Sequence, residues 1–392
     1  MLGEANLKQH KDELIEIRRH LHKFPELANE EFLTSSYIEN YLKDCGLEVT
    51  NGIAGTGLIA VLEGSDGPTI GIRTEMDALP INEEHEVDYR STRDNVMHAC
   101  GHDGHMAVAL ITAKILSGMK NRLKGKVVFI FQPAEENLPA GGAKRMVEDA
   151  EAVLDNVNAI FGFHFWPTLP VGTIAVSKSA MMAAGDVFEI KFRGIGAHGA
   201  NPHQSSDVLM MTSDAILSLT SIISRNIKPG TLATLSVGIV KGGESPNVLP
   251  SLSLTKGTTR YIDESFRDIF PEKIRRVLDG VCNSYNGSYE LNYQYGYPLL
   301  KNDPDMADLV KKCALTAQNV TSIDTVTQPA LTSEDFAVFL EKIPGCYFWI
   351  GSQTNDSEVI NLLHSPKFDL DEMAMLTAVE MYLLICNELL QS

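Results

Sequence analysis

The chain has 392 residues, of which 44% are hydrophobic and 21% are charged, a composition typical of a globular protein of about two domains. Its formal net charge of −18 at pH 7 argues against nucleic acid and anionic membranes as partners, because both are negatively charged. The N-terminal residues are polar and lack the apolar core of a signal peptide. No uninterrupted apolar run approaches the length of about 18 residues expected of a membrane span. We therefore expect a soluble cytoplasmic protein.

Six cysteines lie far apart in the sequence, which is not the pattern of a disulfide framework. In a reducing compartment they would remain free thiols, so that a cysteine is available as a thiolate ligand.

The first half of the chain alternates between helices and strands. We expect helices where apolar residues recur at helical spacing and strands where short apolar runs end at polar residues. The expected helices are 7–23, 31–45, 106–116 and 142–153, and the expected strands are 58–62, 69–73, 126–132 and 159–163.

Residues 184–296 differ from the rest of the chain. They contain 11 Lys plus Arg and 11 Asp plus Glu, so the segment is neutral and the whole negative charge lies outside it. The expected elements are strand 186–193, helix 206–224, strand 231–240, strand 251–260, helix 265–285 and strand 288–295. This βαββαβ order is that of a ferredoxin-like fold.

After the insertion, the sequence predicts helices 304–317 and 333–342, strand 346–351 and helix 371–390. The predicted fold class is therefore α/β, with one α/β domain on a central mixed sheet interrupted by a ferredoxin-like insertion. The expected boundaries are 1–183 and 297–392 for the two parts of the α/β domain, and 184–296 for the insertion.

Polar side chains follow three of the expected strands of the first half. Asp77 comes after strand 69–73, Glu135 and Glu136 come after strand 126–132, and His164 ends the apolar stretch that begins at Ala159. Active sites of α/β sheets are built at the carboxyl ends of the strands. We therefore expect these groups to meet at one edge of the sheet.

The segment Met97–His105 contains a thiol, three imidazoles and a carboxylate within nine residues, all of them groups that hold transition metals. A single Cys is usually a small buried hydrophobe, and a single His is more often structural than a ligand. The density of such groups favours a metal or catalytic role. Because Cys100 precedes an expected helix, the helix dipole would favour its thiolate form.

The adjacent carboxylates Glu135 and Glu136 would, taken alone, be a solvated acidic turn. Here they follow a buried strand and a rigid proline, so that one carboxylate could coordinate a metal while the other faces a reacting water. Asp77, His164 and His364 each allow a structural or a functional interpretation. His198 lies on a Gly-rich turn of the insertion, far in sequence from the other groups.

Several motifs resemble those of a known family. They are Glu75-Met-Asp-Ala-Leu-Pro80, Met97-His-Ala-Cys-Gly-His-Asp103, Gln132-Pro-Ala-Glu-Glu136, the turn at His198, and Leu363-His-Ser-Pro366. Over essentially its whole length the chain resembles the aminoacylase, hippurate hydrolase and indole-acetyl-amino-acid hydrolase group of the carboxypeptidase-G-like metallopeptidases. The resemblance implies a metal-dependent amidohydrolase.

The resemblance also implies a centre of two divalent ions, Zn or Mn, with Co also accepted. Cys100 would bridge the ions, and the remaining ligands would be Glu136 and His364 for one ion and His102 and His164 for the other. Glu135 would act as general base and acid, and Asp77 would orient or tune a ligand.

In the insertion, the resemblance implies that His198 stabilises the oxyanion and binds substrate, with Asn247 and Arg260 as further substrate-binding residues. It further implies that the insertion acts as a lid and forms a homodimer, or a dimer of dimers. The chain departs from the group at Glu75, where Asp is usual and where other branches have a metal-binding His. We assign Glu75 no metal role.

The predicted function is hydrolysis of a small N-acyl amino acid, with an acetyl or aromatic acyl group, to a carboxylate and a free amino acid. One alternative within the same chemistry is a dinuclear metal dipeptidase. Another is a metal-dependent binding protein without turnover, although binding alone requires no proton shuttle of the Asp77, Glu135 and His198 kind. The sequence does not identify the acyl group or the amino acid.

Overall fold

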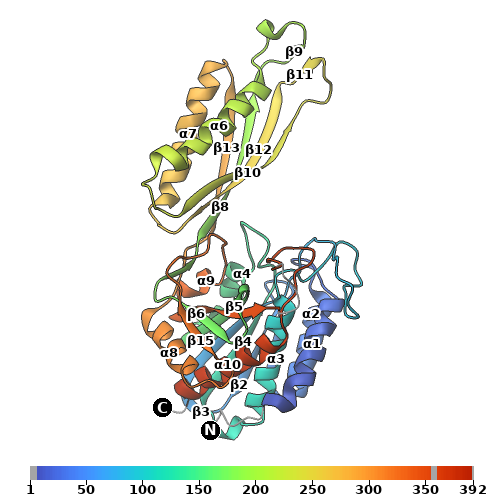
Figure 1. The fold of residues 1–392 in the computed structure, drawn as a ribbon, viewed down its shortest axis with the longest axis vertical. Helices are drawn as coiled ribbons and strands as arrows, with labels where there is room; N and C mark the ends of the chain where they lie inside the picture. The colour runs from blue at the N-terminus through green and yellow to red at the C-terminus, as the bar shows by residue number, and fades with distance from the viewer. Residues whose placement is uncertain (1–6, 355–359, 391–392) are drawn as a thin grey trace.

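The computed structural model describes residues 7–354 and 360–390, and the first six residues of the polar N-terminal segment lie outside this range. Figure 1 shows two lobes, of which the larger carries both chain ends and the smaller contains the elements from β8 to β13. The chain enters the smaller lobe along β8 (Ala184–Arg193) and leaves it along β13 (Ser288–Tyr297).

The larger lobe is built on an eight-stranded sheet with the order β1-β2-β4-β3-β5-β16-β6-β15. The pairs of β3 with β4 and β5, of β5 with β16 and of β6 with β15 are parallel, whereas β1/β2, β2/β4 and β6/β16 are antiparallel. The strands are β1 (Glu48–Ile53), β2 (Gly57–Glu63), β3 (Ser65–Glu75), β4 (Lys124–Gln132), β5 (Ala159–Pro170), β6 (Thr173–Val176), β15 (Ser322–Thr325) and β16 (Gly345–Gln353). The predicted mixed sheet is confirmed.

Helices cover both faces of this sheet. On one face lie α1 (Lys11–Lys23), α2 (Phe32–Asp44), α3 (His102–Ser117), α8 (Pro304–Ala314) and α10 (Met373–Leu390); on the other lie α4 (Ala143–Asp149), α5 (Glu151–Leu154) and α9 (Ala337–Leu340). Alternate residues of β4 point to opposite faces, so Phe129 joins the first core and Ile130 the second. This explains why the central strands read as unbroken apolar runs.

The insertion forms its own antiparallel sheet with the order β10-β12-β8-β13. Helices α6 (Val208–Asn226) and α7 (Phe266–Ser284) pack on it around a separate apolar core. The two remaining long strands are β10 (Ala233–Gly242) and β12 (Leu252–Tyr261). This is the ferredoxin-like arrangement that the βαββαβ order predicts.

Several short elements had no sequence prediction because each is too short to show a period. They are η3 (Lys120–Arg122), η4 (Pro202–Gln204), β7 (Ala180–Met182), β14 (Leu300–Lys301), β9 (Ala197–His198) and β11 (Val248–Leu249), whereas η2 (Leu7–His10) is the first turn of the predicted helix 7–23. Strands β1, β6 and β15 were also not expected. The predicted helix 333–342 is wrong for most of its length, since only Ala337–Leu340 is helical.

Within the described residues, α6 and α10 are long and apolar enough to cross a membrane by length and composition. Neither helix is an uninterrupted apolar run, because Asp214 interrupts α6 and Glu380 interrupts α10. Helix α10 is 72% buried inside the protein and packs against α3, as a core helix does. The inner face of α6 packs on the insertion sheet, with Met211 and Leu219 in its core.

Candidate metal centre

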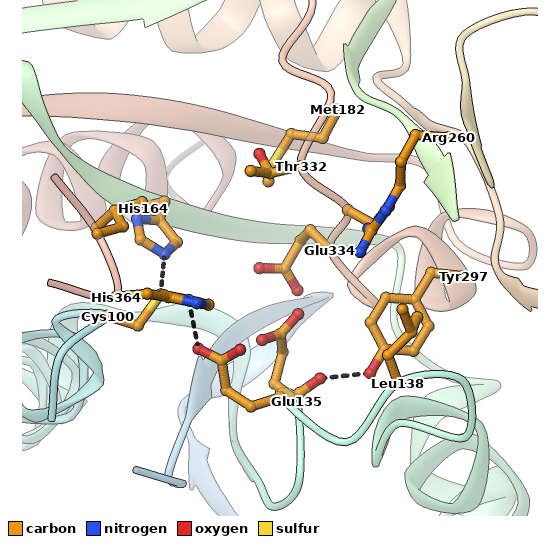
Figure 2. Close-up of a pocket in the computed structure, with 13 residues that line it drawn as sticks. Cys100, Glu135, Leu138, His164, Met182, Arg260, Tyr297, Thr332, Glu334 and His364 are labelled. Carbon is orange, nitrogen blue, oxygen red and sulfur yellow. Dashed lines mark hydrogen bonds and ion pairs between the residues drawn. The ribbon is translucent and has the colours of Figure 1, made fainter. Parts of the chain in front are cut away.

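A cavity of about 320 Å³ lies where the turn after β4 meets β5, and His164 lines it from within β5, not from the end of the strand as expected. Figure 2 shows Cys100, His164 and His364 on one side of it and Arg260, Tyr297 and Leu138 on the other. The predicted site residues that line the cavity are Cys100, Glu135, Glu136, His164, Arg260 and His364. Groups that are far apart in the sequence thus meet at one cavity.

The segment that carries Cys100 turns sharply before α3. Gly101 has a φ of 86°, a conformation that favours glycine, and this turn places Cys100 and His102 on either side of the helix N-terminus. The Nδ1 of His102 lies 2.8 Å from the carbonyl oxygen of Asp77, so Nδ1 carries the proton. The buried Nε2 has no hydrogen-bond partner, so it is the nitrogen that a metal could bind in exchange for a proton.

His164, in β5, faces the same thiol. Its Nδ1 donates to the carbonyl of Phe165 at 2.7 Å, and its Nε2 lies 3.3 Å from Cys100 Sγ. Burial lowers the pKa of His164 to about 3, so the ring is neutral. A neutral imidazole with a fixed tautomer is the form that binds metals.

His364 and Glu136 approach Cys100 from the other side. His364 Nε2 lies 3.1 Å from Glu136 Oε1, and that oxygen makes no directed hydrogen bond. The His364 backbone has a φ of 65° and its N–H donates to the carbonyl of Ala99 at 2.8 Å. This unusual backbone turn is therefore tied to the residue that precedes Cys100.

The turn that carries both glutamates is held by buried carboxylates. Asp77 accepts hydrogen bonds from the backbone N–H groups of Glu135 (3.0 Å) and Glu136 (2.9 Å). Ala134 has a φ of 59°, and its N–H donates to Glu31 at 2.9 Å. Asp77 therefore positions the turn as well as His102, a role that its sequence position alone did not indicate.

Glu135 faces a second buried carboxylate, Glu334, across the cavity (Figure 2). Burial and the nearby charges of Glu334 and Glu136 raise the pKa of Glu135. Burial likewise raises the pKa of Glu334 to about 8, although Arg73 opposes this shift. A carboxylate whose pKa is raised is a stronger base than an ordinary carboxylate. A nearby cation favours its ionised form, which is the form that can accept a proton.

Glu75 lies behind the cavity. Its Oε2 accepts from His105 Nδ1 at 2.8 Å, and its other oxygen is ion-paired with the guanidinium of Arg73. Arg73 also contacts Glu334 (3.0 Å) and Asp335 (2.6 Å). The longer side chain thus pairs with a buried cation, and its carboxylate also lies within 4.8 Å of ligand atoms of His102 and His105. That Glu75 has no metal role stays a prediction.

The geometry and charge of the site fit two divalent ions. Two groups of ligand atoms, each within 4.8 Å, share Cys100: one with His102 and His164, the other with Glu136 and His364. Although burial acts to lower it, nearby carboxylates raise the pKa of His102 to about 10, so the site attracts positive charge. Burial and the neighbouring glutamates raise the pKa of the Cys100 thiol, against the expectation from the helix dipole. Its ionisation would therefore accompany metal binding.

Two predicted residues lie elsewhere in this chain. His198, in β9, and Asn247 lie side by side at the far end of the insertion, where Gly199 N–H donates to the Asn247 carbonyl at 2.8 Å. Figure 1 places β9 and β11 at the end of the small lobe most distant from the large sheet. Only Arg260, near the base of the insertion, reaches the cavity, where it donates to Ser333.

Sequence reasoning missed several buried residues of the site: Arg73, Tyr297, Glu334, Asp335 and Tyr347. Arg73 is the last residue of the expected strand 69–73, so its polar side chain was interpreted as marking the end of that strand. Glu334 and Asp335 were placed inside a helix, whereas they form the turn before α9. The signal that could have revealed them is the run Ser333-Glu334-Asp335, whose adjacent acidic side chains suit a turn better than a buried helix.

Comparison with known proteins identifies the family. Residues 71–388 match the model of "Peptidase family M20/M25/M40". The chain belongs to this family. It is 41% identical over 94% of its length to a Bacillus subtilis protein named as an amidohydrolase, YhaA, of which it covers 92%. It is 37% identical over 95% of its length to the N-acetyl-L-cysteine deacetylase of Bacillus subtilis, of which it covers 87%.

Among solved structures, the family M20 dinuclear metal-binding peptidase YxeP of Bacillus subtilis superposes with a TM-score of 0.81 at 34% identity, covering 98% of this chain and 99% of that one. The resemblance seen in the sequence motifs is therefore confirmed, as is the fold class.

Proposed function

We propose that this chain hydrolyses the amide bond of an N-acyl amino acid and releases a carboxylate and a free amino acid. The observation that carries the proposal is the sharing of one thiol, Cys100, by two ligand groups, with the Glu135 carboxylate beside them. The deacetylase and amidohydrolase names of the relatives support the same reaction class.

Two divalent ions would be held by Cys100 together with two pairs of ligands, Glu136 with His364 and His102 with His164. When bound, such ions lower the pKa of a water molecule to about 7 and polarise a carbonyl group. Thiolate and imidazole ligands favour zinc, and we propose Zn or Mn as the native ion, with Co as a working substitute.

Glu135 would accept the proton of the attacking water and deliver it to the leaving nitrogen. Its position suits this task because it lines the cavity next to Glu136, whereas the ion pair with His364 is made by Glu136. Asp77 would keep the turn in place by accepting the two backbone N–H groups.

We propose a compact acyl amino acid, and not a dipeptide, as the substrate. Its volume of about 320 Å³ is at the lower end of the range of ligand sites. A dipeptide would bring an ammonium group that needs a carboxylate partner, but both oxygens of Glu334 are already engaged, by Arg73 (3.0 Å) and by the Tyr347 hydroxyl (2.7 Å). Arg260 would bind the carboxylate of the amino acid.

We further propose a homodimer formed through the insertion. Strand β10 is an edge of the insertion sheet and leaves Ile239 and Val240 exposed, at 42% and 51%. An exposed apolar edge strand is a surface that a second copy can cover. In such a dimer, His198 and Asn247 would complete the site of the partner subunit, which their distance from the cavity of their own chain requires.

The division into 1–183, 184–296 and 297–392 and a cytoplasmic location also remain proposals. All six cysteines are free thiols and lie within the described residues. This supports a reducing compartment.

The function can be tested with purified protein loaded with Zn, Mn or Co and a panel of N-acetyl amino acids, N-benzoyl amino acids and dipeptides. Release of the free amino acid would be measured for the parent and for Glu135→Gln and Glu136→Gln. We expect Glu135→Gln to keep its metal and lose at least about 100-fold in kcat, the scale of a lost general base, and Glu136→Gln to lose metal.

Preference for dipeptides would overturn the assignment of substrate. Tight metal binding without turnover of any substrate would instead favour a binding protein.

A further inference from the structure

Tyr297 connects the insertion to the turn that carries the catalytic base. It is the last residue of β13, the strand by which the chain returns from the insertion. Its hydroxyl donates a hydrogen bond to the backbone carbonyl of Glu135, as the dashed line in Figure 2 shows. Tyr297 is 5% exposed, so this contact is shielded from water.

The ring of Tyr297 also packs on the far end of the same loop. Gly141 has a φ of 61°, and a Cβ at this position would lie 2.9 Å from the Tyr297 ring. The aromatic ring therefore lies directly on the backbone there. Tyr297 thus contacts the loop after β4 at Glu135 and at Gly141, on both sides of Leu138, which lines the cavity.

The strand that carries Tyr297, β13, is held firmly to its neighbours in the insertion sheet. The N–H of the preceding residue, Gly296, donates to Asp186 at 3.0 Å. The other oxygen of Asp186 accepts from the hydroxyls of Tyr261 (2.9 Å) and Tyr293 (2.8 Å). One buried carboxylate therefore joins β8, β12 and β13 at the base of the insertion.

We propose that Tyr297 is a positioning residue that couples the placement of the insertion to the placement of Glu135. The inference rests on the proposed function, in which Glu135 is the base. The peptide of Glu135 is held from two directions: Asp77, of the large lobe, accepts its N–H, and Tyr297, of the insertion, donates to its carbonyl. If the lower end of the insertion moves, the contact with Tyr297 would therefore move Glu135 as well. Substrate bound to Arg260 would favour the arrangement in which Tyr297 contacts Glu135.

The test compares Tyr297→Phe with Tyr289→Phe in the metal-loaded full-length protein. The first variant removes only the hydroxyl that reaches Glu135. The control removes a hydroxyl of the same strand that donates to Asp279 of α7, away from Asp186 and from the cavity. We measure kcat and KM on the best N-acyl substrate, metal content, and hydrogen exchange of the peptide segment 133–142.

For Tyr297→Phe we expect kcat to fall about tenfold, which corresponds to about 1.36 kcal/mol and is the scale of one lost hydrogen bond. KM should change less than about twofold, metal content should equal that of the parent, and exchange in 133–142 should be faster. The control should show none of these changes.

The inference is overturned if Tyr297→Phe retains the parent kcat and exchange rate, or if it loses metal and kcat together, as a purely structural residue would. If the parent hydrolyses no N-acyl amino acid, the proposed function fails instead, and the exchange comparison still decides whether Tyr297 holds the loop.

Discussion

Asp77→Asn offers a sharp test of how the site is built, because the change is isosteric and replaces one acceptor oxygen by a donor group. In the parent, the two carboxylate oxygens accept the backbone N–H groups of Glu135 (3.0 Å) and Glu136 (2.9 Å), and Asp77 is 1% exposed. In the variant, the amide can accept only one of these hydrogen bonds. Its NH₂ group then faces the other N–H, donor against donor.

The expected magnitude follows from these two contacts. A hydrogen bond to a charged group contributes about 1.5–3 kcal/mol, and a buried N–H left without a partner costs about 1–3 kcal/mol. Because these terms overlap, we expect the free energy of unfolding of the metal-free protein to fall by about 2–4 kcal/mol. Displacement of the turn by about 1 Å would lower kcat/KM by about 100-fold.

Glu31→Gln is the matched control. Glu31 also holds this turn, since it accepts the N–H of Ala134 at 2.9 Å and the hydroxyl of Thr56 at 2.6 Å. A glutamine can keep both contacts, because its carbonyl accepts the N–H and its amide donates to the hydroxyl oxygen. Burial raises the pKa of Glu31, so a neutral side chain is tolerated better here.

Both variants would be studied by urea unfolding and by kinetics with equal metal loading. If Asp77→Asn were no less stable than Glu31→Gln and as active as the parent, Asp77 would not hold the turn.

Two further predictions concern stability and assembly. Buried His22 lies between Asp103 (2.8 Å) and Glu83 (3.2 Å), and although burial acts to lower it, these carboxylates raise the pKa of His22 above 6.5. Its stabilising effect should therefore be complete below pH 6.5 and decline as pH rises through the raised pKa. Urea unfolding at several pH values should show this decline in the free energy of unfolding of the parent but not of His22→Gln. The same pH dependence in both proteins would contradict the prediction. For assembly, mixing His198→Ala with Glu135→Gln under conditions of verified subunit exchange should restore about a quarter of the parent activity. Half of the dimers are then mixed, and each mixed dimer has one complete site out of two. No recovery after exchange would place His198 outside the partner's site.

The residues that gather at the candidate site could be predicted from the sequence because many of them come in short motifs. Cys100 and His102 are separated by one residue, and Glu135 and Glu136 are adjacent, so the spacing itself indicates a site. The βαββαβ order of the insertion could be predicted because each of its helices and strands is long enough to show a period.

The supporting residues could not be predicted because their partners are distant in sequence. Arg73 and Asp335 are 262 positions apart, and Glu135 and Tyr297 are 162 positions apart. Only the fold shows that Arg73 pairs with a cluster of carboxylates, or that Tyr297 at the end of the insertion donates to the backbone carbonyl of Glu135. The short strands β9 and β11 were missed for a related reason: their pairing depends on a contact between two turns and leaves no periodic pattern.

The most direct test of the dinuclear centre is a titration of the metal-free protein with Co²⁺, followed by absorption, metal content and hydrolysis of an N-acyl amino acid. We predict activity that saturates at two ions per chain, together with a thiolate-to-cobalt band that is present in a Cys346→Ser control and absent in Cys100→Ser. Full hydrolysis by protein shown to be free of metal, or an unchanged band and two retained ions in Cys100→Ser, would contradict the account.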